Sequence, residues 1–261
     1  MIILIKGAGD LATGIAHRLK VCGFDVVMTE ISMPTTVRRT VAFSQAVFDG
    51  TTEVEGIKGV LAKDIDEVNK IIEDGHIPVI IDDKAEIIKE LKPKIVVDSI
   101  ISKINSGGTT INDADIVIAV GPGFEAGVDC HCVIESQRGH YLGRTIYNGG
   151  AIPNTGVPGN IGGYTVERII RATDDGEIKP MVNIGDYVEK DQIVAMVNDE
   201  PVYASIAGIV RGMLQEGVKV HKGMKSGDID PRCKREHCFT ISDKARSIAG
   251  GVLEAILTLN R

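Results

Sequence analysis

The sequence predicts an α/β protein in which a mostly parallel sheet is followed by a β-rich module and a C-terminal helix. Three observations predict this class. Short apolar runs alternate with helical patterns up to about residue 120, two segments of the second half repeat each other, and an apolar helical stretch closes the chain. We place these parts at residues 1–150, 164–232 and 239–261, and the Gly-, Pro- and Asn-rich stretch 148–163 serves as the linker.

Composition narrows the class of function. The chain has 261 residues, enough for one large or two modest domains, and its net charge of −7 argues against nucleic-acid binding. Aromatic residues make up only 4%, so platforms for stacked bases are not expected. No apolar window reaches the roughly 18 residues of a membrane span. Five cysteines without an export signal fit poorly with a complete set of disulfides and favour the cytoplasm.

The first half alternates between strand and helix patterns. Strands are expected at residues 2–5, 25–29, 78–81, 94–100 and 115–120, and helices near 10–19 and at 37–48, 64–73 and 85–91. Strands that are apolar throughout are typical of a sheet covered on both faces. Together with the alternation, they predict a doubly wound, mostly parallel sheet.

A glycine motif, GAGDLA, starts at Gly7 between the first strand and the first helix. Gly7 permits the tight turn, Gly9 lets backbone amides approach a phosphate, and Ala12 permits close helix packing. Glu30 ends the second strand about 20 residues on, where an acid can hold ribose hydroxyls. The pattern predicts a Rossmann-like nucleotide or dinucleotide site. In the alternative reading, Asp10 caps its helix and Gly9 only makes the turn.

A second polar group follows the strand that ends near Val120. Arg138 and Arg144 offer planar guanidinium forks to a phosphate or carboxylate, and His140 could assist. We interpret this group as an anion pocket. The alternative is that Glu135 and Arg138 form an ion pair that fixes the loop.

Arg38 and Arg39 follow the second strand in a loop that often faces the same crevice, although a solvated helix face would also explain them. No catalytic residue is assigned. The candidate cofactor-binding residues are Gly7, Gly9, Asp10, Ala12, Glu30, Arg38, Arg39, Glu135, Arg138, His140 and Arg144.

The cysteines predict no metal site. Cys130 and Cys132 flank His131 on an expected strand, so the two thiols share one face and the imidazole points to the other. Structural zinc takes four ligands, in pairs about two to four residues apart. Cys233 and Cys238 could supply a second pair only by folding back, so we expect buried structural thiols.

The second half contains an internal repeat, in which residues 175–190 align with residues 207–222. The matches are Gly176 with Gly208, Met181 with Met213, Gly185 with Gly217, Val188 with Val220 and Lys190 with Lys222. Two such units predict a pseudo-twofold barrel-sandwich like that of biotinyl and lipoyl carrier domains. The hairpin at residues 198–201 has no lysine, which excludes attachment of either cofactor there.

A polar turn follows the repeat. Asp228, Asp230 and Arg232 could bind a polar group of a ligand, or they could form an Asx-type turn in which Arg232 pairs with an acid. Ser242 is the expected cap of the last helix, which we expect to pack on the sheet of the first domain.

Several of these motifs occur together in one family. They are Lys6–Gly14, Arg38–Phe43, Glu135–His140, Gly227–Arg232 and Phe239–Leu257. Over nearly the whole chain they resemble the YqeB-type proteins of selenium-dependent molybdenum hydroxylase systems. The resemblance implies an accessory role in the maturation of xanthine or purine hydroxylases, and a Rossmann portion similar to that of XdhC-type xanthine dehydrogenase accessory factors. It assigns no residue roles.

The function expected from this resemblance is a cytoplasmic maturation factor that binds a dinucleotide or a molybdopterin-type cofactor. Its partners would be the molybdenum hydroxylase and a nucleotide-bearing small molecule, with neither nucleic acid nor membrane, and homo-oligomer formation stays open. One alternative is an NAD(P)-dependent oxidoreductase with His140 as its proton donor. Another is a non-catalytic adaptor that binds the hydroxylase.

Overall fold

The computed structural model describes residues 1–261 and divides into two compact units. The larger unit comprises Met1–Ser32, Ala42–Thr155 and Ile241–Arg261, and the smaller unit comprises Met33–Val41 and Gly156–Thr240. The sequence placed residues 33–41 in the first part. Their place is decided by backbone pairing with a distant strand, because the Val37 carbonyl accepts a hydrogen bond from the Met213 amide.

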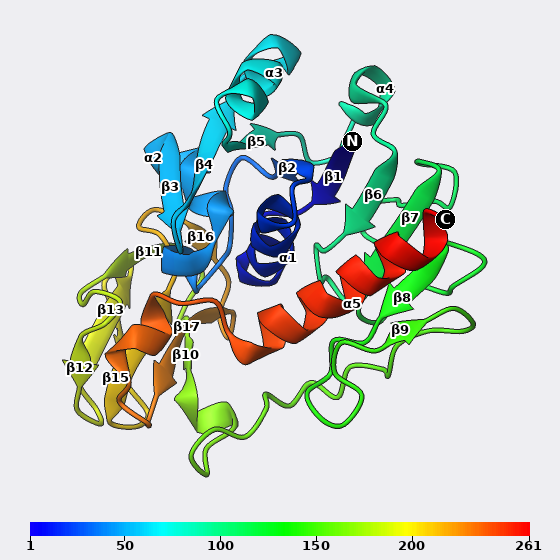
Figure 1. The fold of residues 1–261 in the computed structure, drawn as a ribbon. Coiled ribbons are helices and arrows are strands. Elements are labelled where there is room, and N and C mark those ends of the chain that lie inside the picture. The colour runs from blue at the N-terminus through cyan, green and yellow to red at the C-terminus, as the bar shows by residue number, and fades with distance from the viewer. The chain divides into compact units, whose positions relative to one another are not determined.

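The larger unit is built on one nine-stranded mixed sheet (Figure 1). Its elements are β1 (Ile2–Lys6), α1 (Asp10–Val21), β2 (Asp25–Glu30), α2 (Ala46–Asp49), β3 (Thr51–Val54), β4 (Ile57–Ala62), α3 (Ile65–Glu73), β5 (Ile77–Ile81), α4 (Ile88–Leu91), β6 (Ile95–Asp98), β7 (Ile116–Val120), β8 (Cys132–Ile134), β9 (Thr145–Ile146) and α5 (Asp243–Leu259). The strand order is β3-β4-β5-β2-β1-β6-β7-β8-β9. Pairs from β4 to β8 are parallel, whereas β3 and β9 pair antiparallel at the two edges.

Apolar burial explains why these strands hold together. The central strands carry fully buried side chains such as Leu4, Val27 and Val96, which belong to one core cluster with residues of α3 and α4. Helix α5 packs on α1 and contacts β7, β8 and β9 (Figure 1). None of the helices has both the length and the apolarity that a bilayer crossing requires.

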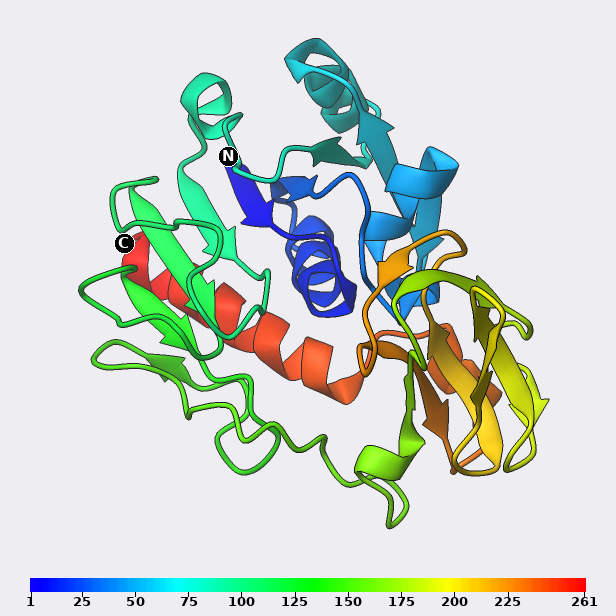
Figure 2. The ribbon, with the colours of Figure 1, turned by 180° about the vertical axis from the view of Figure 1, so that it is seen from behind.

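The prediction of a Rossmann-like domain is wrong for this sheet, which is mixed because both edge pairs are antiparallel. Residues 51–62 form an antiparallel hairpin that the sequence did not predict, with Glu55 and Gly56 in left-handed conformations at its turn. The connection from β6 to β7 contains no helix, as Figure 2 shows from behind. The helix expected at residues 37–48 is reduced to α2 and two 3₁₀ turns, η1 (Arg39–Val41) and η2 (Phe43–Gln45).

The smaller unit contains two four-stranded antiparallel sheets. Its elements are η3 (Val166–Arg168), β10 (Ile169–Arg171), β11 (Gly176–Pro180), β12 (Tyr187–Val188), β13 (Ile193–Val197), β14 (Glu200–Tyr203), β15 (Gly208–Met213), β16 (Lys219–Val220), β17 (Lys225–Asp230) and η4 (Arg235–Cys238). The sheet orders are β10-β17-β15-β12 and β14-β13-β11-β16. The prediction of a biotinyl- or lipoyl-like barrel-sandwich is therefore corrected to two small antiparallel sheets.

The internal repeat nevertheless appears in the strand positions. Strands β15, β16 and β17 start 32 residues after β11, β12 and β13, as the numbering of Gly208 against Gly176 shows. The short strand of each copy pairs with the first strand of the other copy, β12 with β15 and β16 with β11. This exchange places both copies in each sheet, so neither copy can form its sheet alone.

Two adjacent glycines in α5 test how tightly this helix packs. A Cβ on Gly251 would clash with the carbonyl oxygen of Gly143, whereas a Cβ on Gly250 would meet nothing within 4 Å. Gly250→Ala should stabilise the protein by about 0.5–1 kcal/mol through helix propensity. Gly251→Ala should destabilise it by about 1–3 kcal/mol through overpacking. Urea unfolding measures both, and equal effects of the two substitutions would contradict this close packing of α5.

Candidate anion-binding site

Strand β17 carries two buried aspartates at positions where the first copy of the repeat has uncharged residues. At the offset of 32 residues, Asp228 corresponds to Met196 and Asp230 to Asn198. Both aspartates are buried, and so is Ile229 between them. Residues two apart in a strand share a face. The two carboxylates therefore lie on one face of β17, with Ile229 on the other.

Arg168, at the end of η3, compensates the first of these carboxylates. Its Nη1 donates to Oδ1 of Asp228, and both side chains are buried. Nε of Arg168 is also buried but has no hydrogen-bond partner. A buried N–H donor without an acceptor is costly. This arginine therefore has donor capacity that the protein does not use.

Arg211 reaches the second carboxylate from a β-bulge. Between β15 and β17, Val210 pairs with Ile229 and Gly212 with Asp228, so Arg211 is the extra residue on β15. A bulge re-aims the side chain that it carries. Here the result is an arginine with only 7% of its surface exposed, whereas its counterpart in the first copy, Lys179, is exposed.

The contacts of Arg211 leave its two terminal nitrogens without a hydrogen bond. Its Nε lies 4.0 Å from Oδ2 of Asp230 and donates to the carbonyl of His237 at 3.4 Å. Burial and the neighbouring charge of Arg38 lower the pKa of Arg211. The carboxylates of Asp228 and Asp230 act on this pKa in the opposite direction.

Asp230 holds the other charged groups in place. Arg232 donates to it through Nε at 2.9 Å and through Nη2 at 2.6 Å. Burial alone would raise the pKa of Asp230, but the hydrogen bonds and charge of Arg232, with the charge of Arg211, lower it. His237 Nδ1 lies 3.9 Å from Oδ2 of the same aspartate.

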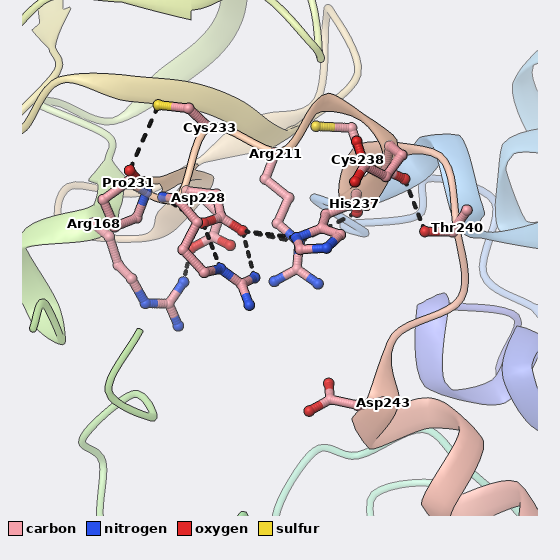
Figure 3. A network of polar contacts seen from close by, with 12 residues as sticks. Arg168, Arg211, Asp228, Pro231, Cys233, His237, Cys238, Thr240 and Asp243 are labelled. Atoms are coloured by element: carbon pink, nitrogen blue, oxygen red, sulfur yellow. Dashed lines mark hydrogen bonds and ion pairs between the residues drawn. The ribbon is translucent and has the colours of Figure 1, made fainter. Parts of the chain in front are cut away.

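The network as a whole has more cationic groups than carboxylates. Within it, Arg168, Arg211 and Arg232 lie against the two carboxylates of Asp228 and Asp230. Figure 3 shows Arg168 joined to Asp228 and Arg211 beside His237, with the two guanidinium groups apart from each other. Guanidinium forks match the oxygens of carboxylates and phosphates. The arrangement can therefore bind an anion.

The glycine motif forms the strand–turn–helix that its sequence suggests, but a side chain of the protein accepts a hydrogen bond from the turn. Gly7 adopts a φ of +91° after β1, Gly9 precedes the first residue of α1, and Ala12 is buried. The Ala8 amide donates to Oε2 of Glu30 at 2.9 Å instead of facing a ligand. Burial raises the pKa of Glu30, against the lowering effect of hydrogen bonds from Ile31 and Ala8.

This occupied turn argues against a phosphate there. The carboxylate of Glu30 takes the amide that a phosphate would use, and Asp10 adds a second acid at the first position of α1. Neither side chain is placed to attract an anion.

The other predicted site residues do not converge on one pocket. Arg38 and Arg39 belong to the smaller unit, where Arg38 donates to the carbonyls of His237 and Thr240 at 3.0 Å and Arg39 to that of Met213 at 3.2 Å. They help to fix η4 and β15.

The residues of the predicted anion pocket in the middle segment make contacts within the protein. Arg138 forms a bidentate ion pair with Asp243 at 2.7 and 2.8 Å. His140 and Arg144 both lie against the ring of Tyr141. Glu135 is buried and accepts hydrogen bonds from the amides of Gln137 and Ile152. Each of the four predicted residues thus has a partner within the larger unit.

The cysteines lie mostly in the core. Cys130, Cys132 and Cys238 are buried and no disulfide is formed. Burial raises the pKa of the Cys130 and Cys132 thiols to about 12. Nδ1 of His131 accepts a hydrogen bond from the Val117 amide, so the imidazole is bonded to strand β7. No group of three or more potential metal-ligating side chains is present.

Comparisons with known proteins give one relative in sequence. No family model matches the chain. It is 49% identical over 258 residues to the uncharacterized protein YqeB of Escherichia coli (strain K12), a match that covers 99% of this chain and 48% of that protein. The chain therefore spans about half the length of this curated relative.

Three solved structures show a weak structural similarity to the chain. They are a succinylglutamate desuccinylase/aspartoacylase from Rhodobacter sphaeroides (11% identity, TM-score 0.28, 87% of this chain and 84% of that one), an aspartoacylase family protein from Mesorhizobium loti (11%, 0.25, 81% and 58%) and the ectoine utilization protein EutE from Ruegeria pomeroyi (18%, 0.23, 32% and 27%). At these TM-scores the likeness does not carry an activity to this chain.

The expected function is corrected on these findings. The sequence relative is named without a function, and none of the similar solved structures is named as a factor of a molybdenum enzyme. The expectation of a maturation factor for selenium-dependent molybdenum hydroxylases is wrong by this comparison. The cofactor and the partners expected with it stay predictions.

Acid unfolding tests the role of Asp230. Because its pKa in the folded protein lies below the unfolded value of about 3.9, its carboxylate adds stability above that value. This contribution is lost as the pH falls through the folded pKa. Asp230→Asn should therefore be less stable than the wild type at neutral pH, and its unfolding free energy should fall less below about pH 4. Exposed Asp199→Asn is the control, and parallel acid limbs for wild type and Asp230→Asn would contradict the assignment.

Thiol labelling tests the assignment of the cysteines. Cys22 and Cys233 are exposed, whereas the other three are buried. Because the thiolate is the reactive form, iodoacetamide should modify two of the five cysteines in the native protein and all five after unfolding. Mass spectrometry of the labelled peptides identifies the sites. Rapid native labelling of Cys130 or Cys132 would show that their strand is not packed in the core.

Proposed function

We propose that the protein binds a small anionic molecule, a carboxylate or a phosphate, through the guanidinium groups of its smaller unit. One observation carries the proposal. Arg168 and Arg211 are both buried, yet Nε of Arg168 and the terminal nitrogens of Arg211 have no acceptor. Since a buried donor such as Nε of Arg168 is costly when unpaired, an anion that accepts from it and from the terminal nitrogens of Arg211 would be stabilised.

Comparison of the two copies of the internal repeat indicates that the fold does not require these buried charges. The first copy forms equivalent strands with Met196 in place of Asp228 and with an exposed Lys179 in place of Arg211. Buried ion pairs are often no more stabilising than apolar residues of similar size. The charges of the second copy are therefore better explained by binding than by folding.

The chemistry favours an anion over a cation. Apart from Nδ1 of His237, the unused groups are N–H donors of guanidiniums, which carry no acceptor. Both carboxylates are already engaged, Asp228 by Arg168 and Asp230 by Arg232. A cytoplasmic location, expected from the cysteine content, stays a prediction.

Calorimetry at constant ionic strength tests the proposal, with inorganic phosphate, pentanoate and glutarate as probes. At least one of them should bind, and Arg211→Met should weaken its binding by about ten- to hundred-fold. This range corresponds to the loss of a charge-assisted hydrogen bond of about 1.5–3 kcal/mol.

The matched control is Arg171→Met, which removes an exposed arginine of β10 in the same unit. It should keep the affinity of the wild type, because surface charges contribute little at moderate salt. The proposal fails if no anion binds, or if the Arg171 and Arg211 variants lose affinity equally.

A further inference from the structure

We infer that the ligand carries two separate anionic groups, one bound by Arg168 and the other by Arg211. This inference rests on the proposed function and names the class of ligand for the same site. The ligand is then a short dicarboxylate, or a molecule with a phosphate at one end and a carboxylate at the other.

The first support is the spacing along β17 of the two aspartates that the arginines contact. Arg168 is held by Asp228 and Arg211 lies beside Asp230, two residues further on the same face. At about 3.3 Å per residue, these anchoring positions are roughly 6–7 Å apart. Each arginine is thus held at its own aspartate, which favours one anionic group for each guanidinium.

The second support is the direction of the unused donors. On Arg168, Nη1 is engaged by Asp228 and Nε is unpaired. On Arg211, Nε faces the His237 carbonyl and the terminal nitrogens are unpaired. Figure 3 shows the two guanidiniums as separate groups that do not stack. Each therefore offers its own set of N–H donors.

The third support is the rigidity of the two arginines. Each side chain is more than nine-tenths buried, with 7% of the residue exposed, and each is held by a buried aspartate or a backbone carbonyl. Side chains fixed in this way cannot readily converge on one small anion. Preorganised donors favour a ligand whose own groups match their separation.

The experiment compares two probes of equal carbon number, glutarate with two carboxylates and pentanoate with one. Glutarate should bind about ten-fold more tightly or better, because a second charge-assisted hydrogen bond forms. 2-Phosphoglycolate, as a third probe, distinguishes a phosphate end from a second carboxylate.

The double substitution Arg168→Met with Asp228→Asn removes the part of the site that would bind the second anionic group. Arg168→Met alone would leave a buried carboxylate unpaired and could unfold the protein, whereas removing both charges avoids this. The double variant should lose the advantage of glutarate while pentanoate still binds at Arg211. Thermal unfolding checks that it is folded. If the double variant does not fold, Arg168→Lys replaces the fork by a point charge and should reduce the same advantage.

The outcomes separate the two proposals. If pentanoate binds as tightly as glutarate and Arg211→Met weakens both, the site takes a single anion: the inference is overturned and the proposed function stands. If glutarate, pentanoate, 2-phosphoglycolate and inorganic phosphate all fail to bind, the proposed function fails and the inference fails with it. A glutarate advantage that persists in the double variant also overturns the inference.

Discussion

Compensation of buried charge on β17 is the constraint on which the candidate site depends. Two aspartates lie in the interior of a small two-sheet unit, where an uncompensated carboxylate would be strongly destabilising. Arg168 and Arg232 supply the compensation from segments on either side of the repeat. Arg211 lies beside the same two aspartates as a third arginine. The unpaired Nε of Arg168, and not the ion pairs themselves, distinguishes this site from a structural cluster.

The internal repeat shows how such a site arises from a plain β framework. Both copies supply three strands in the same order, and each short strand pairs with the other copy. The copies differ at Asp228 and Arg211, which are Met196 and Lys179 in the first copy. A bulge at Arg211 turns the side chain toward β17. Exchange of the short strands keeps both sheets intact, so one copy can carry buried charges while the other supplies apolar packing.

The sequence predicted individual strands and helices more accurately than the way in which they pair and pack. The parallel strands β1, β2, β5, β6 and β7 and the repeat follow from apolar runs and matched glycines, because these signals are local. The two-sheet arrangement depends on pairing between distant segments, which periodicity does not encode. The edge hairpin of β3 and β4 is a local pairing, but its turn at Glu55 and Gly56 was not recognised. Asp228, Asp230 and Arg232 were recognised as a polar turn. Arg168 and Arg211 were missed, although the comparison of Arg211 with Lys179 would have shown an arginine at a strand position flanked by apolar residues.

The central claim is that Arg168 and Arg211 bind an anion, and NMR of the arginine Nε–H groups measures it most directly. In the free protein, Nε–H of Arg168 has no acceptor. On titration with glutarate, its ¹H and ¹⁵N resonances should shift in a saturable way, together with those of Arg211, while those of exposed Arg171 stay unchanged. If the resonances of Arg168 and Arg211 do not move, or move no more than that of Arg171, the arginine cluster is structural and the claim of anion binding is contradicted.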